Sequence, residues 1–199
     1  MQILKSTVKE NILHAAMGEF EEKGYEKTSM RLIAKNAGIT AGNMYRYFGN
    51  KECLFTAVVK PSHERLMDLL QYDAIANKKA RPEKNIAEEI AVLITELFDA
   101  HRRELLILLS KSSGSRYENY KQDLIEMVKR RITDTLMVHF SKNGIQHEDE
   151  VLALAMASSL IEGLIVVLKE CVDKTIIRKL SGKIIEFHFK DMLSIYPVI

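Results

Sequence analysis

Apolar residues recur every three or four positions along most of this chain, which is the spacing of amphipathic helices rather than of strands. The first such pattern predicts a helix over about 5–23, and Gly24 supplies a residue that can end it. Its apolar face consists of Val8, Ile12, Ala15, Ala16 and Phe20. Runs rich in Leu, Ile, Lys and Glu, interrupted by only three Pro, favour helix in the rest of the chain. We therefore expect an all-α protein.

Two short helices joined by a tight turn are predicted next. Thr28 and Ser29 are both suitable N-caps for the first of them, and Gly38 ends it. Thr40 is another N-cap and is separated from that glycine by one residue, so the second short helix runs over about 41–47. This arrangement is a helix-turn-helix.

A longer helix should follow, because Asn50 can cap it and Glu52 lies in its first turn. Pro61 interrupts its pattern. Either the helix kinks at Pro61 and continues to about Leu70, or it stops there and a new helix begins with the proline in its first turn. We favour the kinked continuation.

The remaining pattern predicts five further helices, and so about nine in all. These lie at 82–98, 105–109, 120–140, 148–172 and 175–194. The helix over 148–172 is apolar nearly all the way round and must be covered on more than one side. It contains Ser158, Ser159, Glu162 and Gly163, which favour a buried helix over a membrane span.

Composition narrows the classes of function. With 199 residues and 47% hydrophobic content, the chain can bury a core without disulfides or metal. Cys53 and Cys171 lie far apart in the sequence and belong to no Cys/His cluster with ligand spacing, so we expect no metal, no cofactor and a reducing cytoplasm. There is no GxSxG motif, P-loop or Gly-rich dinucleotide turn, which argues against an enzyme.

Charge is distributed unevenly along the chain. Residues 1–60 contain nine Lys and Arg against six Asp and Glu, whereas the remainder contains twenty against twenty-one. A basic excess of this size is only a weak indication of nucleic-acid binding, so the prediction of DNA binding depends on the sequence motif in this region.

The segment 28–55 closely resembles the DNA-binding signature of TetR-type repressors. Three features of that signature occur in order, namely Ile33-Ala34-x-x-Ala37-Gly38, Tyr45-x-x-Phe48 and Lys51-Glu52-x-Leu54-Phe55. The resemblance implies a helix-turn-helix DNA-binding domain over 1–50 and a helical ligand-binding and dimerisation domain over 51–199. It also implies double-stranded DNA, a second copy of the chain and an unknown small molecule as partners.

The helix over 41–47 would then be the recognition helix, whose first turn faces base edges in the major groove. Asn43 can bond bidentately to adenine, and the Ala41 methyl can meet a thymine methyl. Thr40 is a third candidate reader, and Gly42 would let the backbone come close.

The other predicted DNA contacts are Thr28, Ser29, Tyr45, Arg46, Tyr47 and Lys51. The family pattern assigns phosphate contacts to four of them, which are Thr28, Tyr45, Tyr47 and Lys51. Alternatives stay open for several positions. Thr28 and Thr40 can be explained as helix caps alone, Tyr45 and Tyr47 as packing beside Phe48, and Arg46 as a phosphate clamp, a base reader or a solvated charge.

In relatives of this type, the last two helices meet their symmetry mates in a four-helix bundle. The predicted dimer interface consists of apolar residues that a single chain could hardly cover. They are Leu160, Ile161, Leu164, Ile165, Leu168, Ile177, Leu180, Ile184 and Phe187.

The predicted ligand pocket gathers adaptable and aromatic residues on helices that line it in relatives. They are Met67, Phe98, His101, Leu105, Leu108, Tyr117, Tyr120, Leu124, Met127, Met156 and Glu162. Glu162 is the one ionised residue within an apolar helix, so it needs a partner or a shifted pKa. It could attract a cationic ligand or pair with a basic residue across the dimer interface. His101 is interpreted as structural rather than as a metal ligand.

Together these features predict a cytoplasmic transcriptional repressor that a small molecule releases from a palindromic operator. The alternative is a DNA-bound module of the same fold that recruits a protein partner and has no small ligand.

Overall fold

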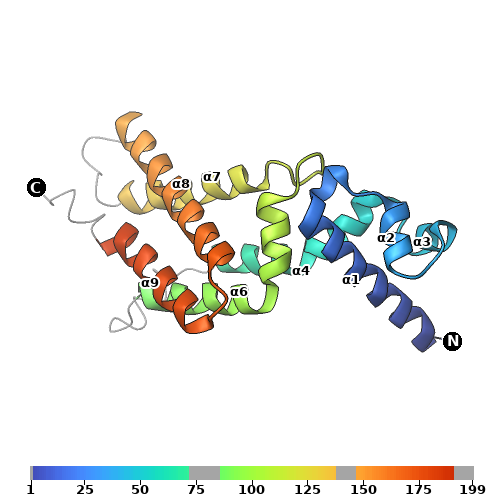
Figure 1. Cartoon of the computed structure of the whole chain (residues 1–199). Coiled ribbons are helices and arrows are strands. Elements are labelled where there is room, and N and C mark those ends of the chain that lie inside the picture. Colours follow the sequence, from blue (N-terminus) through green and yellow to red (C-terminus); the bar gives the residue numbers. More distant parts are fainter. Residues whose placement is uncertain (1, 72–85, 138–146, 191–199) are drawn as a thin grey trace, which may run out of the picture. The chain divides into compact units, whose positions relative to one another are not determined.

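The computed structural model of the chain describes residues 2–71, 86–137 and 147–190, and within these ranges the chain forms eight helices and no strand (Figure 1). The helices are α1 (Gln2–Lys27), α2 (Met30–Asn36), α3 (Ala41–Tyr47), α4 (Lys51–Gln71), α6 (Ile86–Ser110), α7 (Tyr120–Met137), α8 (His147–Glu170) and α9 (Lys174–Lys190). The all-α class predicted from the apolar spacing is confirmed. The parts of the predicted helices at 82–85, 138–140 and 191–194 lie outside the described residues.

Two helices contain a residue that leaves helical geometry. In α1 this residue is Gly24, with φ 76° and ψ 168°, so the predicted end of the first helix marks a real change of direction. In α6 it is His101, with φ −137° and ψ 27°. The two helices predicted over 82–98 and 105–109 are therefore one element with a kink, because no Gly or Pro stands between them to end the first.

Pro61 lies inside α4, which runs on to Gln71, so the alternative in which a new helix begins at the proline is wrong. A proline has no N–H to donate to the carbonyl four residues earlier, and that bond of the helix is missing. The next residue, Ser62, is fully buried and donates its hydroxyl to the Val59 carbonyl at 2.8 Å. Buried packing on both sides of the proline keeps the helix together.

Packing divides the chain into two compact units, one made of 1–65 and 101–121 and the other of 66–100 and 122–199. In the first unit the ring of Phe55 stands edge-on to the rings of Phe20 and Tyr25, with centroids 4.9 Å and 5.0 Å away. The buried Leu105, Ile107 and Leu108 belong to the same unit. A division by packing does not test where a DNA-binding domain ends, so the boundary after residue 50 stays a prediction.

In the second unit, α8 and α9 pack against each other (Figure 1). Small residues allow close approach, since a Cβ added at Gly182 would lie 3.5 Å from the Ala91 side chain and one added at Gly163 would lie 3.5 Å from Ile184. By length and composition, Glu148–Glu170 is also apolar enough to cross a membrane, with a mean hydropathy of 2.4. Its buried residues, including Leu164 and Leu168, explain that composition as a helix core.

Candidate nucleic-acid interface

The two short helices are fixed by caps at their first turns. The Ser29 side chain accepts a hydrogen bond from the Leu32 N–H at 3.3 Å and caps α2, and the Thr40 side chain accepts one from the Asn43 N–H at 3.2 Å and caps α3. Between them, Gly38 has a φ of 69°, a left-handed conformation that suits glycine. The turn closes with a hydrogen bond from the Ile39 N–H to the Ala34 carbonyl at 3.0 Å. The structure thus contains a tight helix-turn-helix.

One residue anchors α3 and leaves most of its other side chains accessible. Met44 is fully buried, and Phe48, directly after the helix, keeps only 6% of its surface exposed. The predicted contacts on this element divide into an exposed set, Thr40, Gly42, Tyr45 and Arg46, and a half-buried set, Ala41, Asn43 and Tyr47. Tyr45 keeps 52% of its surface exposed, so it does not pack as Phe48 does. Short polar, aromatic and basic side chains therefore share one accessible helix seven residues long.

Thr28 lies in the protein interior, although it was predicted among the DNA contacts. Its side chain is 3% exposed, and its hydroxyl lies 2.8 Å from the Gly24 carbonyl and 3.2 Å from the Glu19 carbonyl. It satisfies carbonyls at the end of α1, while Ser29 rather than Thr28 caps α2. The structure therefore shows a structural task for this hydroxyl, and its contact with phosphate stays a prediction.

Lys51 also turns its charge toward the protein. Its Nζ donates hydrogen bonds to the backbone carbonyls of Tyr25, Glu26 and Thr28 at 2.9, 3.3 and 3.1 Å. The same Nζ lies 4.2 Å from the centre of the Tyr25 ring, within cation–π distance.

The hydroxyl of Tyr25 donates to Glu52 Oε2 at 2.8 Å. Burial of the phenol, reinforced by this hydrogen bond, raises the pKa of Tyr25 to about 12. Sequence reasoning did not identify Tyr25 or Glu52 as part of the site. The adjacency of Glu52 to Lys51 was a possible signal, but nothing local connects either residue to Tyr25.

The segment after the α6 kink packs on the same end of α1. The Tyr25 N–H donates to the Lys111 carbonyl at 2.8 Å, and Arg103 binds Glu21 Oε2 through Nε at 2.9 Å and Nη2 at 2.6 Å. The backbone N–H of Arg116 points to Glu52 Oε1 at 3.4 Å. These contacts join residues more than sixty positions apart, so the sequence offered no periodic or motif signal for them.

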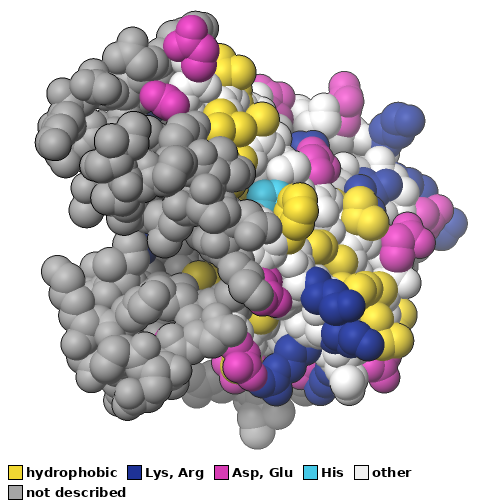
Figure 2. Space-filling model, turned by 90° about the vertical axis from the view of Figure 1, so that its left-hand side faces the viewer, with side chains coloured by type: hydrophobic (Ala, Val, Ile, Leu, Met, Phe, Trp, Pro, Cys, Tyr) yellow, Lys and Arg dark blue, Asp and Glu magenta, His cyan; other side chains and the backbone are white. Residues whose placement is uncertain are grey.

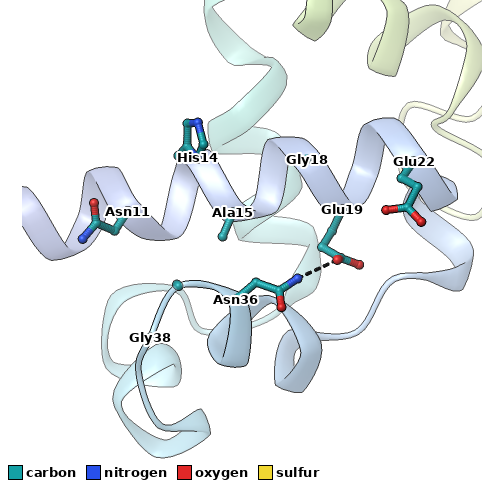
Figure 3. Close-up of a pocket in the computed structure, with 9 residues that line it drawn as sticks. Asn11, His14, Ala15, Gly18, Glu19, Glu22, Asn36 and Gly38 are labelled. Atoms are coloured by element: carbon teal, nitrogen blue, oxygen red, sulfur yellow. Dashed lines mark hydrogen bonds between the residues drawn. The ribbon is translucent and has the colours of Figure 1, made fainter.

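A shallow groove of about 570 Å³ lies between α1 and the turn that joins α2 to α3 (Figure 3). Asn11, His14 and Glu22 line it from α1, and Asn36 lines it from the end of α2, where its side chain donates to Glu19 Oε1 at 2.6 Å. Glu19 is 6% exposed and also pairs with Lys23 at 2.8 Å. The Asn36 bond fastens α2 to α1, and the groove contains none of the residues predicted for a ligand pocket.

The predicted pocket residues are divided between the two compact units. His101, Leu105, Leu108, Tyr117 and Tyr120 belong to the first, and Met67, Phe98, Leu124, Met127, Met156 and Glu162 belong to the second. In the first unit, the centroid of the His63 ring lies 5.8 Å from that of the Tyr117 ring and 5.1 Å from that of the Tyr120 ring. Burial lowers the pKa of His63. Glu162 is exposed in a single chain. Its carboxylate therefore keeps contact with water there, and burial gives no reason to expect a special partner. Across the residues that the structure describes, no three His, Cys, Asp or Glu side chains are grouped to hold a metal ion.

The apolar residues predicted for a dimer interface are mostly covered by their own chain. Leu160, Ile161, Leu164, Ile165, Leu168 and Ile177 are all less than 9% exposed, so the expectation that one chain could hardly cover them is wrong. A helix accommodates two buried stripes when neighbours from its own unit flank it. Leu180 and Ile184 are half-buried, and Phe187 is 73% exposed.

A different stripe of α8 faces outward. It consists of Val151, Ala155, Ser159, Glu162 and Val166, which follow one another at three- and four-residue spacing. Val166 keeps 55% of its surface exposed, and Ile176 and Phe187 keep 49% and 73% on α9. Figure 2 shows hydrophobic side chains at the surface among charged ones. We call these seven residues the outer α8–α9 face.

Comparison with known proteins agrees with this arrangement. Residues 12–58, which include α2, α3 and both caps, match the family described as "Bacterial regulatory proteins, tetR family". A crystal structure of a transcriptional regulator (TerR/AcrR family) from Aquifex aeolicus VF5 is similar over 88% of this chain and 96% of that chain, with 28% identity and a TM-score of 0.58. Residues 12–58 therefore form a helix-turn-helix domain of the TetR family.

Other TetR-family comparisons are more limited. The HTH-type transcriptional regulator UidR of Escherichia coli (strain K12) is 34% identical over 67 residues, so the chain aligns with only about a third, 34%, of the length of that relative. The crystal structure of the regulator FadR from Bacillus subtilis in complex with stearoyl-CoA has a TM-score of 0.53 at 19% identity and covers 89% of this chain and 96% of that one. The second similarity shows the TetR-family fold alone.

Proposed function

We propose that this TetR-family protein is a DNA-binding transcriptional regulator, a cytoplasmic repressor that binds a palindromic operator as a homodimer and is released by a small molecule. The observation that carries this proposal is the exposed face of α3. A buried Met44 and two capped helix starts hold that face rigidly, within the segment that matches the family. A recognition helix needs this combination of a fixed backbone and free side chains.

Each accessible side chain has a chemical task in the proposal. Asn43 bonds adenine through both amide atoms, and Thr40 and the Ala41 methyl complete the reading of base edges. Gly42, which has nothing within 4 Å of an added Cβ, lets the backbone approach the groove. The hydroxyls of Ser29, Tyr45 and Tyr47, with the Arg46 guanidinium, bind phosphates and set the register.

The outer α8–α9 face is the proposed surface of dimerisation. Four large apolar side chains of this face, Val151, Val166, Ile176 and Phe187, are exposed in a single chain, and exposed apolar side chains grouped in this way are typical of a protein–protein contact. The residues predicted from the sequence would then support the interface from beneath, except Phe187, which belongs to the outer face itself. A two-fold axis through this face presents two recognition helices to two inverted half-sites.

The small-molecule site is proposed among the predicted pocket residues of the second unit, which include Met67, Phe98, Leu124, Met127 and Met156. Support comes from their apolar and aromatic character and from the stearoyl-CoA bound in the FadR structure. A regulator that recruits a protein partner instead remains the second candidate. Ligand-dependent shifts in melting temperature would support the first candidate, and their absence across a broad panel of small molecules would favour the second.

Selection of bound duplexes from a random pool tests the central proposal. We expect a palindrome whose half-site centres lie about 34–36 Å apart, or a multiple of this, which is roughly 10 base pairs per turn. Enrichment of one asymmetric site, or no enrichment above non-specific binding, would contradict the proposed symmetry and the proposed function respectively. Asn11→Ala in α1 should select the same palindrome as the wild type, because Asn11 lies in the groove on α1 and not on α3.

A further inference from the structure

We infer that Lys51 is a positioning residue of the DNA interface, which fixes the connection between α1 and α2 instead of contacting a phosphate. The inference rests on the proposed function and assigns a different task to a residue that the family resemblance places at the phosphate backbone. Its basis is where the three N–H groups of Lys51 point.

An ammonium group has three N–H donors, and in this structure three backbone carbonyls receive them. The acceptors are the carbonyls of Tyr25, Glu26 and Thr28, at 2.9, 3.3 and 3.1 Å. The face of the Tyr25 ring lies 4.2 Å from the same nitrogen. The charge is therefore fully engaged by the protein, and a phosphate contact would require at least one of these bonds to break.

Two of these carbonyls, those of Tyr25 and Glu26, lie in the last turn of α1, and the third, that of Thr28, lies directly after it. The last carbonyls of any α-helix lack an intrahelical donor, and here Gly24 leaves helical geometry three residues before the end of α1. Thr28 supplies a hydroxyl to the Gly24 carbonyl and its N–H to the Tyr25 carbonyl, at 2.8 Å and 3.3 Å. A lysine at the negative end of a helix dipole completes the set.

The position of this capped end determines where the next helix begins. Thr28, whose carbonyl Lys51 holds, is followed directly by Ser29, which caps α2. From α2 the chain passes through the Gly38 turn into α3 within four residues. Fixing the Thr28 carbonyl to the first residue of α4 therefore fixes α2 and α3 relative to the rest of the first unit.

The testing variant is Lys51→Met, which keeps most of the side-chain length and removes the three donors. Loss of hydrogen bonds to a charged group predicts operator affinity about tenfold weaker. Because the register of α3 is what changes, non-specific affinity and its salt slope should stay at the wild-type values. Amide exchange in DNA-free protein should accelerate about tenfold at Thr28 and Leu32, whose N–H groups are hydrogen-bonded, and stay unchanged at Val58 and Val59 in the α4 core.

Other results would overturn the inference. A lost phosphate contact weakens specific and non-specific binding together and makes the salt slope shallower by roughly one unit per contact, with no change in DNA-free exchange. Simple loss of folded protein weakens both affinities in proportion and accelerates exchange at Val58 and Val59 as well. If wild-type protein bound no DNA, the proposed function would fail, and the exchange experiment alone would still decide whether Lys51 holds the connection.

Nuclear magnetic resonance on the wild-type protein covers the case in which Lys51→Met does not fold. The ¹⁵N signal of the Lys51 ammonium should show scalar coupling across its hydrogen bonds to the carbonyl carbons of residues 25, 26 and 28. We expect these couplings both in free protein and in the operator complex. Coupling to phosphorus in the complex, in place of the carbonyl couplings, would refute the positioning role.

Discussion

Two accessible surfaces of this protein differ in what they offer to a partner. The exposed side of α3 presents hydroxyls, an amide and a guanidinium, which can exchange hydrogen bonds with water for bonds to another hydrated molecule. The outer α8–α9 face presents mainly Val151, Val166, Ile176 and Phe187, whose side chains form no hydrogen bonds, beside the polar Ser159 and Glu162. The first surface suits a polyanion with an ordered pattern of acceptors, and the second gains only when water leaves it. The difference separates recognition from assembly within one chain.

The largest expected effect comes from placing a charge on the outer α8–α9 face. Val166→Glu should convert a dimer into monomers, because each uncompensated buried charge costs about 3–5 kcal/mol. Sedimentation velocity over a range of concentrations measures this. Val172→Glu is the matched control, since Val172 is 79% exposed and lies in the connection between α8 and α9. A dimer that survives Val166→Glu would place the interface elsewhere.

Leu164→Glu tests the buried side of the same helix, α8. Leu164 is 8% exposed within its own unit, so we expect this variant to unfold or aggregate rather than to yield folded monomers. Circular dichroism of the variant shows whether its helices are folded, and sedimentation velocity shows whether the folded protein is monomeric. Folded monomers would mean that Leu164 is part of the interface, as the sequence suggested.

A smaller effect is expected on the polar surface. Asn43→Ala should cost about 1–3 kcal/mol on the preferred operator and relax the choice of base at one position in each half-site. Non-specific affinity should hardly change, because no phosphate contact is lost. Full discrimination retained at every position would remove Asn43 from the base readers.

Much of the first surface could be predicted because its determinants are local. The caps Ser29 and Thr40, the Gly38 turn and the buried Phe48 all follow from residues within a few positions of one another. The sequence did not show which face of α8 is covered by its own chain, and the reason is physical. A helix that is apolar all round carries no contrast to show which stripe its own chain covers, and Leu164 and Val166 look alike until α9 and the other helices of the unit are in place.

The network around Tyr25 gives a more modest effect, in the interior that supports α2. Tyr25→Phe removes the donor to Glu52 and should lower the free energy of unfolding by about 1–2 kcal/mol. Because the pKa of Tyr25 is raised, its contribution is complete below pH 10 and is lost as the pH rises from 10 through about 12. Phenolate absorbance should show an ionisation near pH 12 that is absent in Tyr25→Phe. A titration curve unchanged by the substitution would contradict the assignment.

The smallest expected effect concerns His63. Burial lowers its pKa below the ordinary value of 6.5, so the unfolded chain binds a proton more readily than the folded protein. Stability should therefore be highest above pH 6.5 and fall as the pH drops below that value toward the lowered pKa. His63→Gln should flatten this part of the melting-temperature profile, whereas His14→Gln, at an exposed position in α1, should not. Equal profiles for all three proteins would remove His63 as the cause.

The contact between the start of the chain and the segment after the α6 kink has a consequence for the order of synthesis. A ribosome makes α1 to α4 well before residues 101–121, yet Lys111 accepts the Tyr25 N–H and Arg103 pairs with Glu21. A nascent chain that stops within residues 66–100 therefore carries a complete helix-turn-helix sequence without the partners of its first helix. This unit can close only after residue 121 of the 199 has been made, which is about three fifths of the chain, and products that terminate sooner should compete poorly with the full-length protein for operator DNA.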